Sequence, residues 1–239
     1  MMRSTTTSRS SISRRHFLTC SAALGVGALA TGVALPAALL ADEPSQGAGA
    51  PPSPAEALER LRNGNARFAA GQPINPQQDL ARLREVAPQQ RPFAALLGCA
   101  DSRVPIELVY DQGFGDVFVV RVAGNVATSV EIASLEYGTR VLGATALVVL
   151  GHSNCGAVKA ALQGGEVPGQ ISTLYQHIAP ALDRKKMDLD AAIVANVRYQ
   201  ARKLKKGSTV LSRLLVDGKL ALVGAVFELE TGKVRTVEL

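Results

Sequence analysis

Two short polar motifs, each placed directly after an apolar run, constrain this chain more than any other feature. Cys99-Ala-Asp-Ser-Arg103 follows the run 93–98, and Gly151-His-Ser-Asn-Cys-Gly156 follows the run 146–150. Both runs are short, uncharged and apolar on both faces, which predicts strands buried inside a parallel sheet. Ligands bind at the carboxyl ends of such strands in open α/β sheets. If the two strands are neighbours, two thiols and one imidazole converge on one point, and we predict a metal site there.

The donor atoms of these motifs are those that zinc prefers. Structural zinc sites have four protein ligands, whereas catalytic sites leave one position for water. The chain offers Cys99, His152 and Cys155, with no fourth Cys or His beside them. This count predicts an open site whose fourth ligand is water or a nearby carboxylate. His177 lies in a predicted helix without a ligand-spaced neighbour, and we interpret it as an ordinary helix residue.

Asp101 is the carboxylate closest to the predicted ligands in sequence. Alternate residues of an extended segment point the same way, so Cys99, Asp101 and Arg103 can face one pocket. A bidentate ion pair with Arg103 would keep Asp101 ionised and away from the metal. In that position Asp101 can orient a zinc-bound water, and when released it can close the coordination sphere as a fourth ligand. The alternative is a surface ion pair without a further role.

The first 41 residues have the form of a twin-arginine export signal. Ser13-Arg-Arg-His-Phe-Leu18 opens the segment, and no charged residue follows from 17 to 41. The segment is rich in alanine and glycine, and such weak hydrophobicity suits a signal better than a permanent span. We expect cleavage after Ala41, contact with the twin-arginine export machinery and a periplasmic or otherwise exported protein. The alternative is a membrane anchor formed by an uncleaved leader.

The net charge of +6 gives no indication of nucleic-acid binding. Four arginines and no acidic residue fall in residues 1–41, so the rest of the chain is close to balance. No basic stripe with interleaved aromatic residues occurs there, and we expect no nucleic-acid partner. A Pro/Gly/Ala-rich linker at 42–53 then precedes one domain at 54–239.

The domain opens with a helix and continues as alternating strands and helices. Ser53-Pro-Ala-Glu56 predicts a capping box, and the apolar stripe of the helix that follows needs the chain's own core or a partner subunit to cover it. We predict an α/β fold with a mostly parallel four-stranded sheet flanked by helices, an N-terminal helical arm and a C-terminal hairpin. Strands are expected at 93–98, 117–121, 146–150 and 220–228, the hairpin arm at 234–239, and later helices at 128–140, from 153 or 154 to 164, and at 171–183, 190–205 and 208–216.

Four motifs together resemble the β-class carbonic anhydrases. They are Cys-Ala-Asp-Ser-Arg-Val (99–104), Phe-Val-Val-Arg-Val-Ala-Gly-Asn (118–125), Ser-Leu-Glu-Tyr (134–137) and Gly-His-Ser-Asn-Cys-Gly (151–156). The resemblance runs from about Pro54 to the C-terminus. It implies an N-terminal helix that lies across a partner, an obligate homodimer or higher homo-oligomer, and zinc near the dimer interface.

The resemblance also implies roles for individual residues. Zinc would be bound by the three ligands named above, and Asp101 and Arg103 would form a gating pair. Gln90 matches a substrate-facing glutamine, although the position also suits a solvated residue before a strand. Phe118 and Tyr137 match cleft residues supplied by the neighbouring subunit, although both also suit plain core packing. Gly156 matches the backbone N–H beside the last ligand.

The activity that this resemblance implies is the reversible hydration of CO2 to bicarbonate and a proton. One alternative keeps the scaffold and hydrolyses CS2 or COS, and another is a binding module with a structural zinc or a disulfide between the two cysteines. Some members have a second bicarbonate pocket, whose pattern Gly98, Val104 and Arg121 fit. The tryptophan typical of that pocket is replaced by Leu96, which makes bicarbonate inhibition an open expectation.

Overall fold

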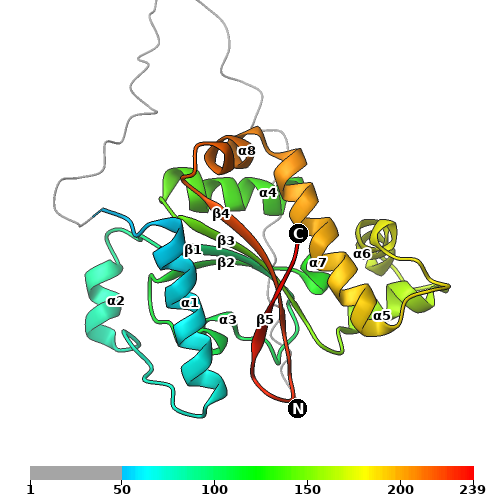
Figure 1. The fold of residues 1–239 in the computed structure, drawn as a ribbon, viewed down its shortest axis with the longest axis horizontal. Helices are drawn as coiled ribbons and strands as arrows, with labels where there is room; N and C mark the ends of the chain where they lie inside the picture. Colours follow the sequence, from blue (N-terminus) through cyan, green and yellow to red (C-terminus); the bar gives the residue numbers. More distant parts are fainter. Residues whose placement is uncertain (1–49) are drawn as a thin grey trace, which may run out of the picture. The chain divides into compact units, whose positions relative to one another are not determined.

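A five-stranded sheet forms the centre of the domain (Figure 1). The computed structural model describes residues 50–239, so the predicted export signal and linker residues 42–49 lie outside the described residues. The strand order is β2-β1-β3-β4-β5, with four parallel strands and β5 antiparallel to β4. The predicted α/β fold is confirmed, and the C-terminal hairpin arm joins the four-stranded sheet as its fifth strand. The strands are β1 (Ala94–Gly98), β2 (Val117–Arg121), β3 (Ala146–His152), β4 (Ala221–Phe227) and β5 (Val234–Val237).

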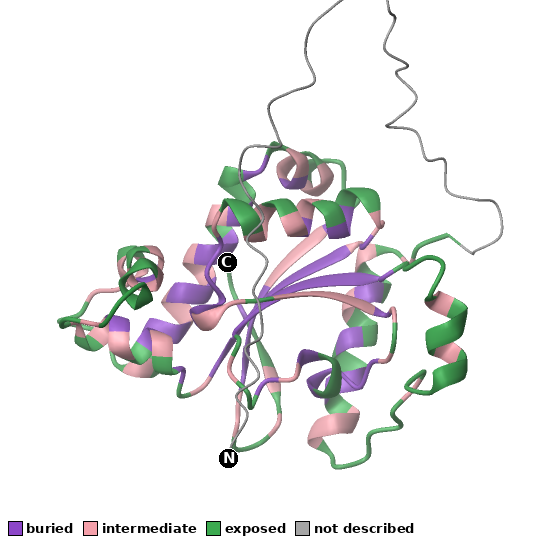
Figure 2. Ribbon diagram, turned by 180° about the vertical axis from the view of Figure 1, so that it is seen from behind, coloured by how far each residue is buried: buried purple, intermediate pink, exposed green. Residues whose placement is uncertain are grey.

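Helices cover both faces of the sheet, and the central strands β1 and β3 are buried along their whole length (Figures 1 and 2). The short helices α2 and α3 were not predicted, because seven and four residues give too few turns for a helical period to show. Within residues 50–239, no helix is both long and apolar enough to cross a membrane. The helices are α1 (Pro54–Ala69), α2 (Leu80–Val86), α3 (Ile106–Val109), α4 (Ser129–Glu136), α5 (Gly156–Gln163), α6 (Ile171–Ile178), α7 (Leu189–Gly207) and α8 (Thr209–Val216), with shorter helical turns at Ala123–Asn125, Tyr137–Val141 and Ala179–Ala181.

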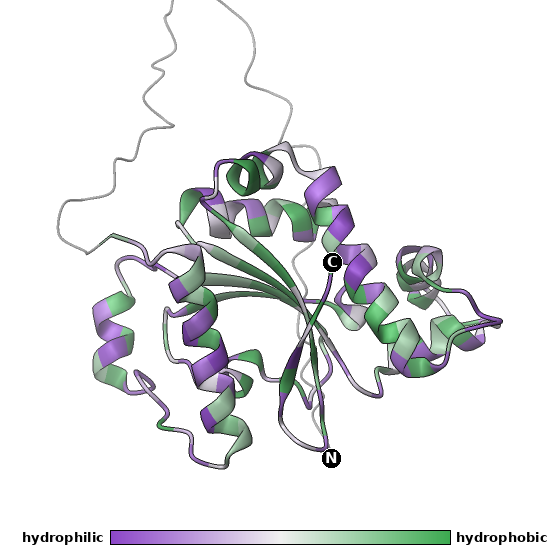
Figure 3. Cartoon of the chain, in the orientation of Figure 1, coloured by the Kyte–Doolittle hydropathy of each residue, from purple (hydrophilic) through white to green (hydrophobic). Residues whose placement is uncertain are grey.

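The sheet separates two apolar clusters, one on each face. Successive residues of β1 alternate between them: Ala95 and Leu97 pack with α4, α5, α7 and α8, while Ala94 and Leu96 pack with α1 and α3. All four are fully buried. This explains why the strand is apolar on both faces, and Figure 3 shows the same hydrophobic character along the central strands.

Helix α1 packs on the chain's own sheet. The predicted capping box is present, because Ser53 Oγ accepts from Glu56 N at 3.3 Å and Glu56 Oε2 accepts from Ser53 N at 2.7 Å. Further along the helix, Ala57 and Leu61 are buried in the same cluster as Phe93. The chain's own core therefore covers the buried part of the apolar stripe, and packing of this helix against a partner subunit stays a prediction.

Asp111 fastens the C-terminal end of α1 to the loop that follows it. Its carboxylate is buried and accepts hydrogen bonds from Arg67 Nε at 2.6 Å, Ile74 N at 3.2 Å and Asn75 N at 2.9 Å. Burial opposes ionisation, but the bonds from Arg67 and the two backbone N–H groups outweigh it, and the pKa of Asp111 lies below its usual value. The ionised carboxylate is thus part of the folded structure.

We expect Asp111→Asn to lower the free energy of unfolding at pH 7 by about 2 kcal/mol. This is less than a fully buried pair would lose, because the Arg67 side chain is 33% exposed and can turn to solvent. Since folding lowers the pKa of Asp111, the stabilisation is present above the unfolded pKa of about 4 and disappears as the pH falls toward the folded value. Urea unfolding at pH 7 and pH 3 measures this. Asp183→Asn, at an exposed ion pair with Lys186, should have little effect at either pH.

Candidate metal centre

The two polar motifs meet at the carboxyl edge of the sheet. β1 and β3 are adjacent and parallel, with Gly98 opposite Leu150, so the residues after each strand lie side by side. Cys99 follows β1 directly, His152 is the last residue of β3, and Cys155 precedes α5. All three side chains are buried, and their ligand atoms lie within 4.8 Å of one another. The structure therefore brings together the three residues that were predicted as metal ligands.

His152 is oriented as a metal ligand would be. Its Nδ1 lies 2.9 Å from the backbone oxygen of Ser153, which assigns the hydrogen to Nδ1 and leaves a lone pair on Nε2. Nε2 is fully buried and has no hydrogen-bond partner within the described part of the chain. A buried nitrogen without a partner is destabilising unless it binds something else. Cys99 and Cys155 are free thiols. Two thiols and one imidazole nitrogen fit a zinc ion, whose bonds to sulfur and nitrogen are about 2.0–2.3 Å.

The surroundings of Cys99 favour a negative charge on its sulfur. The backbone N–H of Gly124 donates to Cys99 Sγ at 3.3 Å. A hydrogen bond from Cys155, with smaller contributions from His152 and this N–H group, outweighs burial and lowers the pKa of Cys99. The same bond and burial raise the pKa of Cys155. A divalent cation would deprotonate both thiols, because its charge exceeds every other local effect.

Asp101 and Arg103 form a bidentate pair at the edge of this group. Arg103 Nε donates to Asp101 Oδ1 at 2.9 Å, and Arg103 Nη2 donates to Oδ2 at 2.7 Å. These bonds hold the pKa of Asp101 well below its usual range. Asp101 Oδ2 lies 3.7 Å from His152 Nε2, beyond hydrogen-bond distance. Asp101 is therefore next to the predicted ligands, but both of its oxygen atoms are engaged by Arg103.

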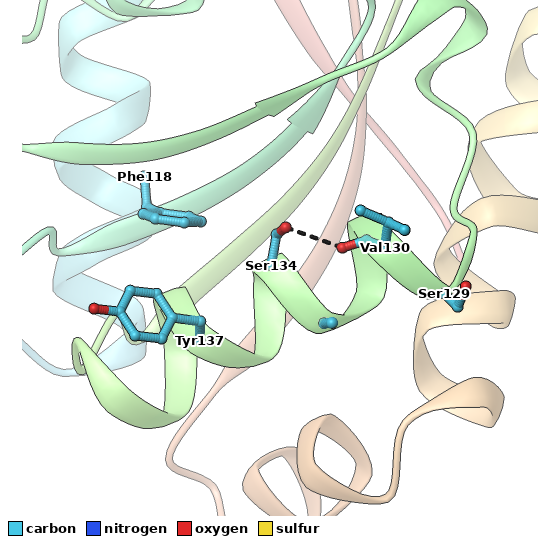
Figure 4. Close-up of a pocket in the computed structure, with 6 residues that line it drawn as sticks. Phe118, Ser129, Val130, Ser134 and Tyr137 are labelled. Atoms are coloured by element: carbon cyan, nitrogen blue, oxygen red, sulfur yellow. Dashed lines mark hydrogen bonds between the residues drawn. The ribbon is translucent and has the colours of Figure 1, made fainter. Parts of the chain in front are cut away.

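Phe118 and Tyr137 lie together at a different place on the chain. Their ring centroids are 6.2 Å apart with the ring planes tilted by 54°, and Figure 4 draws both side chains among the residues that line a hollow here. The hollow has a volume of about 490 Å³, and Tyr137 is half-exposed. Its lining includes neither of the two cysteines nor His152, and consists of Phe118, Ser129, Val130, Ala133, Ser134 and Tyr137.

The two remaining predicted site residues are both exposed. Gln90 lies in the segment between α2 and β1. Gly156 is the first residue of α5, and no atom lies within 4 Å of the position that a Cβ would occupy there. The space beside Cys155 is therefore open at the start of this helix.

Comparisons with known proteins identify the family. The sequence model described as carbonic anhydrase matches residues 94–234, a span that includes all three predicted ligands. A carbonic anhydrase of Mycolicibacterium smegmatis is 41% identical over 190 residues, which cover 76% of this chain and 92% of the relative. Among solved structures, the β-carbonic anhydrase CcaA matches with a TM-score of 0.60 and 25% identity, covering 76% of this chain and 95% of that one. The chain belongs to the β-class carbonic anhydrase family.

A second sequence relative and a second solved structure support the same family. Carbonic anhydrase 2 of Mycobacterium tuberculosis is 38% identical over 189 residues, 76% of this chain and 91% of the relative. One of two tetrameric β-carbonic anhydrases from Sordaria macrospora matches with a TM-score of 0.58 and 25% identity, covering 77% of this chain and 96% of that one. The chain is therefore an enzyme of the carbonic anhydrase type.

Two residues of the carbonic anhydrase motifs support the site in ways that their sequence did not indicate. Arg121, at the end of β2, donates from Nε to the backbone oxygen of Cys99 at 2.9 Å and from Nη2 to that of Asp101 at 2.6 Å. Ser153 holds His152, and is itself held by Leu229 N, which donates to Ser153 Oγ at 2.9 Å. Both residues lie inside quoted motifs, but a motif does not show which backbone atoms its side chains reach.

The residues connected with the second bicarbonate pocket of some carbonic anhydrases are packed here. A Cβ at Gly98 would lie 2.4 Å from Ile106 Cδ1, so the side chain of Ile106 fills the space beside this glycine. Val104 and Leu96 are fully buried in the same cluster. Arg121 is occupied by two backbone carbonyls. Gly98, Val104 and Leu96 therefore belong to the packed core, and Arg121 lies at the end of β2 beside it.

Proposed function

We propose that the chain is a zinc-dependent enzyme that reversibly hydrates CO2 to bicarbonate and a proton. The observation that supports this most directly is the buried, unpartnered Nε2 of His152, which shares a 4.8 Å cluster with the sulfurs of Cys99 and Cys155. These three residues would hold the metal. When bound, zinc supplies the Lewis acidity that lowers the pKa of a water molecule to about 7.

Asp101 is the proposed positioning group for the attacking water. Its carboxylate stays ionised because Arg103 donates two hydrogen bonds to it, and an ionised carboxylate can accept a hydrogen bond from the water. The same pair with Arg103 keeps Asp101 from acting as a fourth metal ligand. Arg121 fixes the backbone on which Asp101 is carried, since it donates to the Asp101 carbonyl.

Gly156 and Gln90 are the proposed donors to the substrate. The N–H of Gly156 is at the start of α5, where free N–H groups and the helix dipole favour the negative charge that develops on a bicarbonate oxygen. The open space beside Gly156 suits a small substrate such as CO2. Gln90 is exposed in the segment before β1 and would bring an amide to the same substrate.

We further propose that the active enzyme is a homodimer or a higher homo-oligomer. Phe118, Val130 and Tyr137 line a hollow that none of the predicted metal ligands shares, and Val130 and Tyr137 are exposed there. A second copy would cover this face and place the two aromatic side chains in the cleft of the other subunit. Relatives from Sordaria macrospora are tetramers. Sedimentation of the active enzyme measures its mass, and a fully active monomer would contradict the proposal.

Metal analysis combined with a substrate comparison tests the proposed function. The purified enzyme should contain about one zinc per chain and accelerate CO2 hydration in a stopped-flow assay. CS2 and COS are offered to the same preparation as alternative substrates. Turnover of CS2 or COS without CO2 hydration would assign the scaffold to the other reaction. Full CO2 hydration by a protein that contains no metal would refute the zinc-dependent mechanism.

We propose that the protein is exported in the folded state by the twin-arginine machinery. The free, buried thiols of Cys99 and Cys155 would then receive zinc in the cytoplasm before they meet an oxidising compartment. Replacing Arg14 and Arg15 by lysine should keep the enzyme in the cytoplasmic fraction, as measured by fractionation and activity. Unchanged export of this variant would show that the route is different, and wild-type activity in the membrane fraction would indicate an uncleaved anchor.

A further inference from the structure

Two amide side chains of α7 lie buried in the apolar core. Asn196 and Gln200 are one helical turn apart, and both are 0% exposed. Their neighbours on the same face of the helix are apolar residues such as Val197 and Leu204. Burying an amide is unfavourable unless its polar atoms are hydrogen-bonded, so the contacts of these two side chains explain why they are present.

The two amides form a connected network that ends on the turn between β2 and α4. Gln200 Nε2 donates to Asn196 Oδ1 at 2.9 Å and to the His177 carbonyl at 2.8 Å. Asn196 Nδ2 donates to the Gly124 carbonyl at 2.9 Å, and Gln200 Oε1 accepts from Ala127 N at 2.9 Å. Each amide oxygen and nitrogen therefore has a partner. The turn is held at two points, 124 and 127, by residues more than 70 positions later in the chain.

This turn is the one that contacts the metal centre. Gly124 adopts a φ of +73°, and its N–H donates to Cys99 Sγ at 3.3 Å. A Cβ at this position would lie 2.7 Å from Ile178 Cδ1, so α6 also closes in on the turn. The direction of one N–H group toward a ligand sulfur thus depends on the position of the whole turn.

We propose that Asn196 and Gln200 are positioning residues of the metal centre. They fix the turn so that the N–H of Gly124 points at the sulfur of Cys99. Donors of this kind orient a ligand and stabilise its charge, and removing them typically weakens metal binding by about 10- to 100-fold. The inference rests on the proposed zinc site, and it adds to that site two residues from a helix that carries none of the ligands.

The variant Asn196→Leu tests the proposal, because leucine has a similar volume and cannot bond to Gly124. We expect the zinc dissociation constant, measured by competition with a chromophoric chelator, to rise by about 10- to 100-fold. In the cobalt-substituted protein, the absorption bands that arise from thiolate–cobalt bonds should shift or weaken. Gln200→Met is the milder second variant: it keeps the bond between Asn196 and Gly124, and should show a smaller change of the same kind.

Asn65→Leu is the matched control. Asn65 is also a buried amide, and its three hydrogen bonds join α1 to Val109, Gly232 and Val234 rather than to the metal centre. This variant should lose stability but keep wild-type zinc affinity and the wild-type cobalt spectrum. Unchanged zinc affinity and spectra in both α7 variants, or an equal loss in the control, would overturn the positioning role. A wild-type protein that binds no zinc would instead contradict the proposed function.

Discussion

The His152→Ala variant is expected to lose its zinc and, with it, CO2 hydration by roughly 10³-fold or more in kcat/KM. His152 provides the only nitrogen of the ligand group. Its Nε2 has no hydrogen-bond partner among the described residues, so it is available to the metal. Removing the ring leaves two sulfurs in a buried cavity, which is too few ligands for a stable zinc site. Zinc per chain and stopped-flow hydration rates, measured on the same preparation, check this expectation.

His177→Ala is the matched control for this substitution. His177 is a half-buried residue of α6 and is not part of the metal group. Its backbone oxygen accepts from Gln200, and the substitution leaves that oxygen in place. Zinc content and activity should therefore stay near the wild-type values. If His152→Ala kept both its zinc and its activity, the assignment of the metal centre would be wrong.

The ligands could be predicted from the sequence because the two motifs that carry them each follow a strand with a clear pattern. An uncharged apolar run leads directly into Cys99 and another into His152, and parallel neighbours necessarily place their carboxyl ends together. The fold followed from the same patterns. Element ends were less certain: the helix expected over 128–140 is α4 up to Glu136 and then a wider turn, Tyr137–Val141.

The supporting residues of the site could not be predicted in the same way. The contact between Asn196 and Gly124 joins two segments 72 residues apart, and it depends on how α7 packs across the sheet. In sequence, Asn196 and Gln200 interrupt an otherwise apolar helix face, which indicates buried polar groups but not their partners. From its motif, Arg121 was connected with a second bicarbonate pocket, and the motif did not indicate its hydrogen bonds to the backbone oxygens of Cys99 and Asp101.

The Asp101→Asn variant is expected to keep its zinc but lose roughly 10²-fold or more in kcat. The three ligands are unchanged, so metal binding should persist. An amide is uncharged and has one oxygen, so it cannot accept both hydrogen bonds from Arg103. It also lacks the negative charge with which the carboxylate would orient the attacking water. Zinc content and hydration kinetics, measured together, separate this effect from a loss of the metal.

Asp217→Asn is the matched control. It shows whether losing any aspartate–arginine pair lowers kcat, or only the loss of the pair beside the metal centre. Asp217 also pairs with an arginine, Arg213, but on the exposed surface of α8, where such a pair contributes little. The same substitution there should leave kcat and zinc content unchanged. If Asp101→Asn were as active as Asp217→Asn, the pair of Asp101 with Arg103 would be a surface contact beside the metal, and the orienting group would have to be sought elsewhere. A selective loss at Asp101 would place the carboxylate in the reaction, because the two variants differ only in the location of the lost charge.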